Sequence, residues 1–114
     1  MTRVATATGS RHEKTVYILR LEGGNYYVGA TSDLNRRLEQ HRRGNGAAWT
    51  KKHPVVELAA SSDPVRNWWA LEREVTLRMM RKYHWRNVRG AGWTERQLSS
   101  PPAALRADAT EANQ

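Results

Sequence analysis

The chain has 114 residues and a formal net charge of +8, which suits one domain with a modest hydrophobic core. It contains no cysteine, and this excludes a disulfide framework, a thiol nucleophile and a thiolate zinc site. A surface this basic attracts polyanions, nucleic acid above all. The sequence has no apolar run of about 18 residues and no apolar signal region at its N-terminus, so we expect a cytoplasmic protein that does not span a membrane.

The two ends of the chain differ in composition from the middle. Residues 1–13 are small and polar, and residues 99–114 are rich in Ala, Pro and Ser around a single large apolar residue, Leu105. Neither end carries enough apolar surface to offset its ordering entropy, so we predict flexible tails over 1–13 and 98–114. The folded domain is then expected over residues 14–97.

The first predicted elements form a β-hairpin. TVYILRL at 15–21 is rich in β-branched and aromatic residues, which is typical of a strand. EGGN at 22–25 is a tight turn, because glycine and asparagine tolerate positive φ. YYVGA at 26–30 is the returning strand.

A helix is predicted next, over residues 33–43. Thr31 or Ser32 is the expected N-cap, and Asp33 falls in the first turn, where the helix dipole favours an anion. Gly44 follows as the residue that ends the helix with positive φ.

A third strand and a second helix complete the expected fold. HPVVELAAS at 53–61 is the strand, and Asp63 and Pro64 open a helix that ends near residue 83 or 84. WRNVRGAGWTE at 85–95 is too rich in glycine for a regular element. We therefore predict an α+β fold, with a three-stranded mixed or antiparallel sheet flanked by helices.

Arg37 and His41 lie four residues apart on the first helix, so their side chains are neighbours on one face. The two side chains repel each other once the imidazole is protonated. A phosphate between them would explain the pair, because the guanidinium would bind its non-bridging oxygens and the imidazole would orient it or relay a proton. A solvated basic helix is the alternative. Arg36 and Arg43 point elsewhere, as surface charge that would contact nucleic acid.

The second helix carries one carboxylate within its apolar stripe. Glu72 falls at the centre of that stripe and Glu74 points to the polar side. A carboxylate there is costly unless it is paired or holds a metal. A buried ion pair and a ligand for a divalent cation both remain open at this point. The stripe consists of Val65, Trp68, Trp69, Val75, Met79, Met80 and Tyr83.

The aromatic residues divide into core and surface candidates. Tyr17 and Tyr27 belong to the two hairpin strands, and by themselves they favour core packing with the hydroxyl groups at the rim. Trp49 lies in a basic loop, where it would stack on a base beside two lysines. Those lysines are Lys51 and Lys52, whereas Trp68 and Trp69 are expected in the core.

Together these motifs resemble the GIY-YIG nuclease family. TVY at 15–17 and YVG at 27–29 match its two signatures, and LNRRLEQH matches the following helix with Arg37 and His41 in place. The resemblance covers roughly residues 15–95 and is closest to a small stand-alone branch of the family.

The resemblance implies a metal-dependent DNA endonuclease with single- or double-stranded DNA as its partner. One Mg²⁺ or Mn²⁺ would be held by Glu72. Tyr17 would act as general base or position the water, and Tyr27 would support the nucleophile or the scissile phosphate. Arg37 would stabilise the phosphate, and His41 would assist proton transfer. Asn87 would hold the active site in place, and Arg89 would bind nucleic acid.

The match has departures, and alternatives remain open. Thr15 stands where glycine is usual, Ala30 replaces a basic or bulky residue, and one branch pattern would select Glu74 as the metal ligand. A basic nucleic-acid-binding module without cleavage activity is the alternative function. With one domain, target choice would come from the loops at 44–53 and 85–96 or from a targeting partner, or specificity would be low. A homodimer would permit a double-strand cut.

Overall fold

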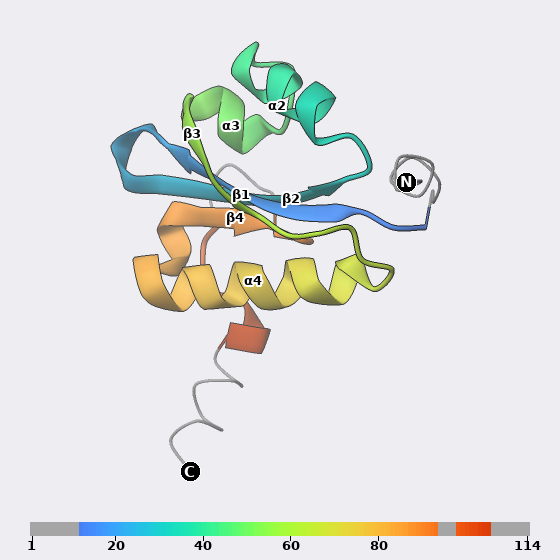
Figure 1. Ribbon diagram of the computed structural model, residues 1–114. Helices are drawn as coiled ribbons and strands as arrows, with labels where there is room; N and C mark the ends of the chain where they lie inside the picture. The colour runs from blue at the N-terminus through green and yellow to red at the C-terminus, as the bar shows by residue number, and fades with distance from the viewer. Residues whose placement is uncertain (1–11, 94–97, 106–114) are drawn as a thin grey trace, which may run out of the picture.

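A computed structural model describes residues 12–93 and 98–105 of the protein. A four-stranded sheet, in the order β3-β1-β2-β4, lies between two helical layers (Figure 1). The predicted α+β class is confirmed, with one strand more than expected. The strands are β1 (Thr15–Leu21), β2 (Asn25–Thr31), β3 (Val55–Ser61) and β4 (Val88–Gly90).

The predicted hairpin of β1 and β2 is confirmed. The strands pair antiparallel with Tyr17 opposite Gly29, and a 3₁₀ turn, η1 (Glu22–Gly24), joins them. Gly23 and Gly24 have φ of 77° and 78°, a conformation that side chains disfavour. On its other edge, β1 pairs antiparallel with β3.

The fourth strand lies where the sequence predicts irregular structure. After a 3₁₀ turn, η2 (Trp85–Asn87), β4 runs parallel to β2 at the edge of the sheet. A Cβ on Gly90 would lie 2.7 Å from the carbonyl oxygen of Val28, so glycine permits this close approach. Three residues are too few to show a strand's alternating pattern, and the pairing is therefore invisible in the sequence.

Two short helices, α2 (Leu34–Arg42) and α3 (Ala48–Lys52), cover one face of the sheet (Figure 1). The N-cap of α2 is Asp33, whose carboxylate accepts a hydrogen bond from the Arg36 amide at 3.1 Å, and this corrects the prediction of Thr31 or Ser32. Gly44 ends the helix as predicted, with φ of 80°.

One long helix, α4 (Trp68–Tyr83), covers the opposite face (Figure 1). It begins later than predicted, because the backbone of Val65 forms an antiparallel bridge with Lys14. Both N–H···O bonds of that bridge are 3.0 Å long, and they hold this segment extended. The helix therefore has Asn67, not Asp63, at its N-cap.

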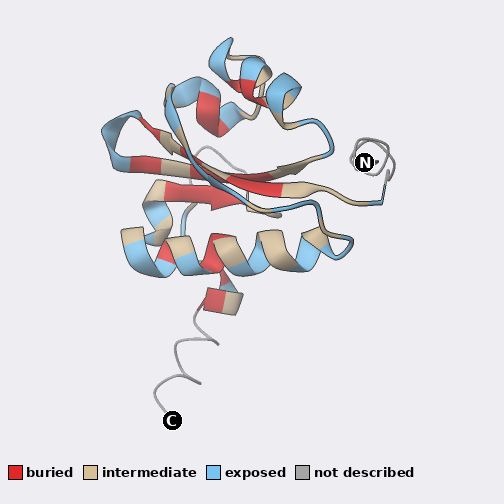
Figure 2. Ribbon diagram, viewed as in Figure 1, coloured by how far each residue is buried: buried red, intermediate tan, exposed pale blue. Residues whose placement is uncertain are grey.

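The sheet separates two hydrophobic clusters, and buried residues line both of its faces (Figure 2). Leu105 is buried in the cluster beneath α4, although the sequence places it in a flexible tail. The rest of that tail, 106–114, and most of 1–13 lie outside the described residues. The α4 cluster is Val16, Val28, Leu77, Met80, Val88 and Leu105, and the α2–α3 cluster is Tyr17, Leu19, Leu21, Tyr27, Leu38 and Trp49.

Candidate active site

Two tyrosines meet on the α2–α3 face of the sheet. Tyr17 of β1 and Tyr27 of β2 are both buried, with ring centroids 6.3 Å apart. A Cβ on Gly29 would come within 2.5 Å of the Tyr17 hydroxyl oxygen and 2.9 Å of the Tyr27 ring. The glycine of the second signature therefore makes room for both phenols.

A hydrogen-bonded chain leads from Tyr17 into the layer of short helices. The Tyr17 hydroxyl lies 2.8 Å from Nε2 of His41, and Nδ1 of His41 lies 2.9 Å from Oγ1 of Thr50. Thr50 donates its own proton to the carbonyl oxygen of Ala47, at 2.9 Å. Thr50 must then accept from Nδ1–H, so Nε2 of the neutral imidazole accepts from the Tyr17 hydroxyl.

The surroundings keep this chain neutral at ordinary pH. Burial, and secondly the charge of Arg37, lower the pKa of His41 to about 4. Burial is also the main cause that raises the pKa of Tyr17 and of Tyr27 above the ordinary phenol value. At neutral pH, His41 is therefore uncharged, and its Nε2 can accept the hydrogen bond from the Tyr17 hydroxyl.

Arg37 brings the positive charge of the site. It is half-buried on α2, and its Nη1 donates to Oε1 of Gln40 at 2.8 Å. Its hydrogen bonds and charge lower the pKa of both Tyr17 and Tyr27, against the larger effect of burial. The guanidinium thus faces the two phenols, and the structure brings Arg37 and His41 into one cluster.

Glu72 enters from the opposite layer, on α4. It is half-buried, and burial raises the pKa of its carboxyl group while the Ala91 amide and the charge of Lys14 lower it. Its charge in turn raises the pKa of Tyr17 and Tyr27. Glu74, by contrast, is exposed and paired with Arg78 at 2.9 Å. Helical phase and burial thus agree on Glu72.

A single carboxylate suits a cation that keeps most of its water. Within residues 12–93 and 98–105, no group of three or more His, Cys, Asp or Glu side chains could hold a metal. Magnesium is commonly bound by one or two carboxylates, with waters and substrate phosphate oxygens completing the octahedron. Glu72 fits that role as the only protein ligand within the described part of the chain.

Asn87 is not brought to this cluster. Its Nδ2 donates to the carbonyl oxygen of Tyr83 at 2.9 Å, at the C-terminal end of α4. Tyr83 in turn stacks on Tyr26, near the hairpin end of β2. The side chain of Asn87 is thus bonded to the end of α4, whereas Tyr27 of the cluster pairs with Arg89 of the following strand.

The structure corrects the assignment of Trp49 and Arg89 as exposed contacts for nucleic acid. Trp49 is 3% exposed, and its Nε1 donates to the Tyr26 carbonyl oxygen at 2.8 Å. Arg89 is 2% exposed, lies 4.2 Å from the Trp49 ring centroid and donates to carbonyl oxygens including that of Trp85. The short helix α3 turns the indole inward, which the basic composition of the segment conceals.

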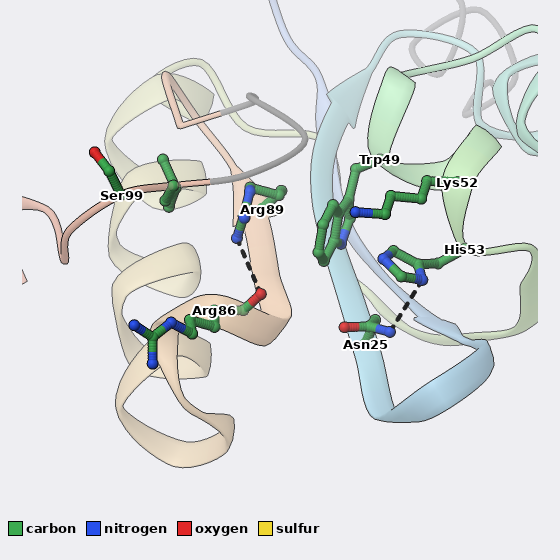
Figure 3. A pocket seen from close by; sticks show the side chains of 8 residues that line it. Asn25, Trp49, Lys52, His53, Arg86, Arg89 and Ser99 are labelled. Carbon is green, nitrogen blue, oxygen red and sulfur yellow. Dashed lines mark hydrogen bonds between the residues drawn. The ribbon is translucent and has the colours of Figure 1, made fainter.

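These two side chains are in contact with each other, and both line a hollow of about 710 Å³ between α3 and β4 (Figure 3). Asn25 and His53 lie at its edge, with Asn25 Nδ2 and His53 Nδ1 3.2 Å apart. Of the other basic candidates, Arg36, Arg43, Lys51 and Lys52 are exposed.

Sequence reasoning missed two residues of the site. Thr50 orients His41 from nine positions away, and Lys14 lies near Glu72 from the start of β1. No local pattern marks either residue, because each contact depends on how distant segments pack.

Comparison with known proteins shows the family of the chain. The model of the GIY-YIG catalytic domain matches residues 13–86. The chain therefore belongs to the GIY-YIG family, whose domain is generally a nuclease domain. The matched region holds Tyr17, Tyr27, Arg37, His41 and Glu72, and it ends before Asn87.

The similar proteins are UPF0213 proteins. One from Xanthomonas axonopodis pv. citri is 46% identical over 46 residues, which cover 40% of this chain and 45% of that protein. The chain thus matches less than half the length of the Xanthomonas relatives. One from Orgyia pseudotsugata multicapsid polyhedrosis virus is 33% identical over 90 residues, or 79% of this chain and 80% of that protein. No solved structure matches. No helix within the described residues is long and apolar enough to cross a bilayer.

Proposed function

We propose that the protein is a metal-dependent endonuclease that hydrolyses phosphodiester bonds in DNA. The observation that carries the proposal is the chain from Tyr17 through neutral His41 to Thr50, next to Arg37 and Glu72. A solvated basic surface has no need of a buried imidazole hydrogen-bonded to a buried phenol. Hydrolysis does need a proton acceptor, a cation for the phosphate and an anchored metal.

The arrangement of these side chains supports the following course for the reaction. A water molecule attacks phosphorus and gives a proton to the Tyr17 hydroxyl oxygen, while the phenol proton passes to Nε2 of His41. The ester bond breaks, and the leaving oxygen keeps the bonding electron pair. Arg37 binds the non-bridging oxygens, whose charge grows in the transition state. When bound at Glu72, Mg²⁺ or Mn²⁺ would supply Lewis-acid stabilisation of the same charge.

Thr50 acts only through His41 and is a positioning residue in this scheme. It holds the tautomer in which Nε2 is free to accept. The raised pKa of Tyr17 disfavours a standing phenolate. In this scheme the phenol therefore passes its own proton to Nε2 of His41 only as it receives one from the attacking water.

A cleavage assay with two neighbouring carboxylate variants tests the proposal. Single-stranded, duplex, flap and supercoiled plasmid DNA are incubated with Mg²⁺ or Mn²⁺, or with EDTA. We expect cleavage that EDTA abolishes and that Glu72→Gln lowers by at least about 100-fold, in line with the loss of one charge-stabilising group. Glu74→Gln is the matched control on the same helix and should retain full activity, because Glu74 only pairs with exposed Arg78.

Two outcomes would contradict the proposal. Equal activity of Glu72→Gln and wild type would remove Glu72 from the site. No cleavage of any substrate, with DNA binding retained, would instead favour a binding module without catalysis.

A further inference from the structure

The N-terminal turn of α4 carries an aromatic pair at the protein surface. Trp69 is 60% exposed, more than any other large hydrophobic residue that the structure describes. Trp68 packs against it edge to face, with ring centroids 5.9 Å apart and an interplanar angle of 88°. The sequence predicts both in the core. Trp68 does pack, partly buried, against the α4 cluster, whereas the exposure of Trp69 corrects the prediction.

Basic side chains surround this pair. A hollow of about 590 Å³ beside it is lined by His12, Lys14, Arg66, Trp68 and Trp69. Nζ of Lys14 lies 4.1 Å from the Trp68 ring centroid. None of the described residues that line the hollow is acidic. Aromatic surface within positive charge is the combination that binds a nucleobase together with its phosphate.

The aromatic pair adjoins the candidate active site. Trp69 precedes Glu72 by three residues, which is about 4.5 Å along a helix axis. Lys14 lies near Glu72 and also lines a second hollow, of about 320 Å³, together with Arg36, Arg37 and the acidic Asp33. Basic side chains therefore extend from the hollow beside Trp69 past Lys14 to Arg37.

We propose that Trp69, backed by Trp68, is a stacking platform for an unpaired base next to the scissile phosphate. This rests on the proposed nuclease function and names its substrate class, which is DNA that is single-stranded at the cleavage point. Bases inside a duplex already stack on their neighbours, so their faces are not accessible to an indole. An indole–base stack contributes about 1–3 kcal/mol and tolerates any base.

Binding measured in EDTA tests the platform without cleavage. Fluorescence anisotropy gives the affinity of wild type, Trp69→Ala and Trp69→Tyr for a labelled 12-nucleotide dT strand and for a 12-base-pair duplex. We expect Trp69→Ala to weaken strand binding by about 5- to 150-fold, which corresponds to the stacking energy. Duplex binding should change by less than about twofold, and Trp69→Tyr should recover most of the affinity because a phenol ring also stacks.

A second variant controls for loss of exposed apolar surface in general. Val56 is also exposed, at 46%, and lies on β3. Val56→Ala should leave strand binding unchanged. In addition, an abasic site moved along the strand should weaken binding to wild type at one or two positions, and should have no effect on binding to Trp69→Ala.

Three outcomes would overturn the platform. They are unchanged strand affinity in Trp69→Ala, equal losses for strand and duplex, and a change of oligomeric state in sedimentation without a change in DNA affinity. The last would make this surface a protein interface. Binding is measured without metal and cleavage is measured with metal. The binding experiment can therefore disprove the platform without bearing on the proposed nuclease activity, and the cleavage assay can disprove the activity without bearing on the platform.

Discussion

At the scale of single residues, burial decides what His41 can do. In the sequence, Arg37 and His41 form an unfavourable pair as soon as the imidazole is protonated. In the structure His41 is 1% exposed, with both ring nitrogens in hydrogen bonds. Its pKa of about 4 keeps it neutral beside Arg37, and the pair is compatible with the fold.

This lowered pKa predicts how stability depends on pH. The unfolded imidazole takes up a proton near pH 6.5, whereas the folded one resists protonation down to about pH 4. Acid therefore favours the unfolded state, and the folded protein should lose about 2 kcal/mol from this group between pH 7.5 and 5. Urea unfolding at the two pH values measures the loss.

The comparison protein is His41→Gln, which cannot titrate in this range. Between pH 7.5 and 5, the free energy of unfolding of this variant should fall by about 2 kcal/mol less than that of wild type. Identical pH dependence in the two proteins would show that His41 is accessible to protons in the folded state.

At the scale of elements, Asn87 illustrates how a motif position and a structural position can differ. The resemblance implies that Asn87 braces the active site. The structure instead places Asn87 in η2, where it binds the last residue of α4, Tyr83, through a side chain–backbone hydrogen bond. That bond joins the end of α4 to the start of β4.

We therefore expect Asn87→Ala to affect the fold more than the chemistry. Loss of one hydrogen bond of this kind should lower the free energy of unfolding by about 1 kcal/mol. Cleavage per folded molecule should stay within about twofold of wild type, because the Asn87 amide donates to the Tyr83 carbonyl oxygen and not to a side chain of the cluster. Urea unfolding and a cleavage assay on the same preparations separate the two effects. Lost cleavage with unchanged stability would restore the role that the resemblance implies.

At the scale of the whole molecule, charge and aromatic surface contribute differently to DNA binding. The net charge of +8 attracts DNA from every side, but only contacts with phosphate release counterions. Lys51 is exposed on α3, in the layer that holds Arg37, whereas Lys82 is exposed near the end of α4. Replacing either lysine removes the same charge.

Salt dependence should distinguish the two lysines. If Lys51 contacts phosphate, Lys51→Gln should reduce the slope of log affinity against log salt by about 0.7 for single strands, and Lys82→Gln should leave it unchanged. Anisotropy titrations between 50 and 200 mM salt, roughly the range over which such slopes are measured, give the comparison. Equal slopes for both variants would show that the charge of Lys51 acts only at long range.

The sequence alone determined the parts of this protein that local signals specify. β-Branched and aromatic residues around a glycine turn predicted β1 and β2, and Gly44 marked the end of α2. Helical phase alone places Glu72 in the apolar stripe and Glu74 on the polar side. The two signatures with Arg37 and His41 identified the GIY-YIG family, because their spacing depends on one hairpin and one helix.

Only the tertiary structure decided which side chains are inside. Trp49 and Arg89 are buried because α3 packs over the edge formed by β2 and β4, although the sequence presents them as surface residues. Trp69 is exposed although it shares the helical phase of the buried Thr76 and Met80, and it lies in the first turn of α4. Thr50 reaches His41 through the same packing of α3 on α2. Burial is a property of contacts between distant segments, and local composition does not encode them.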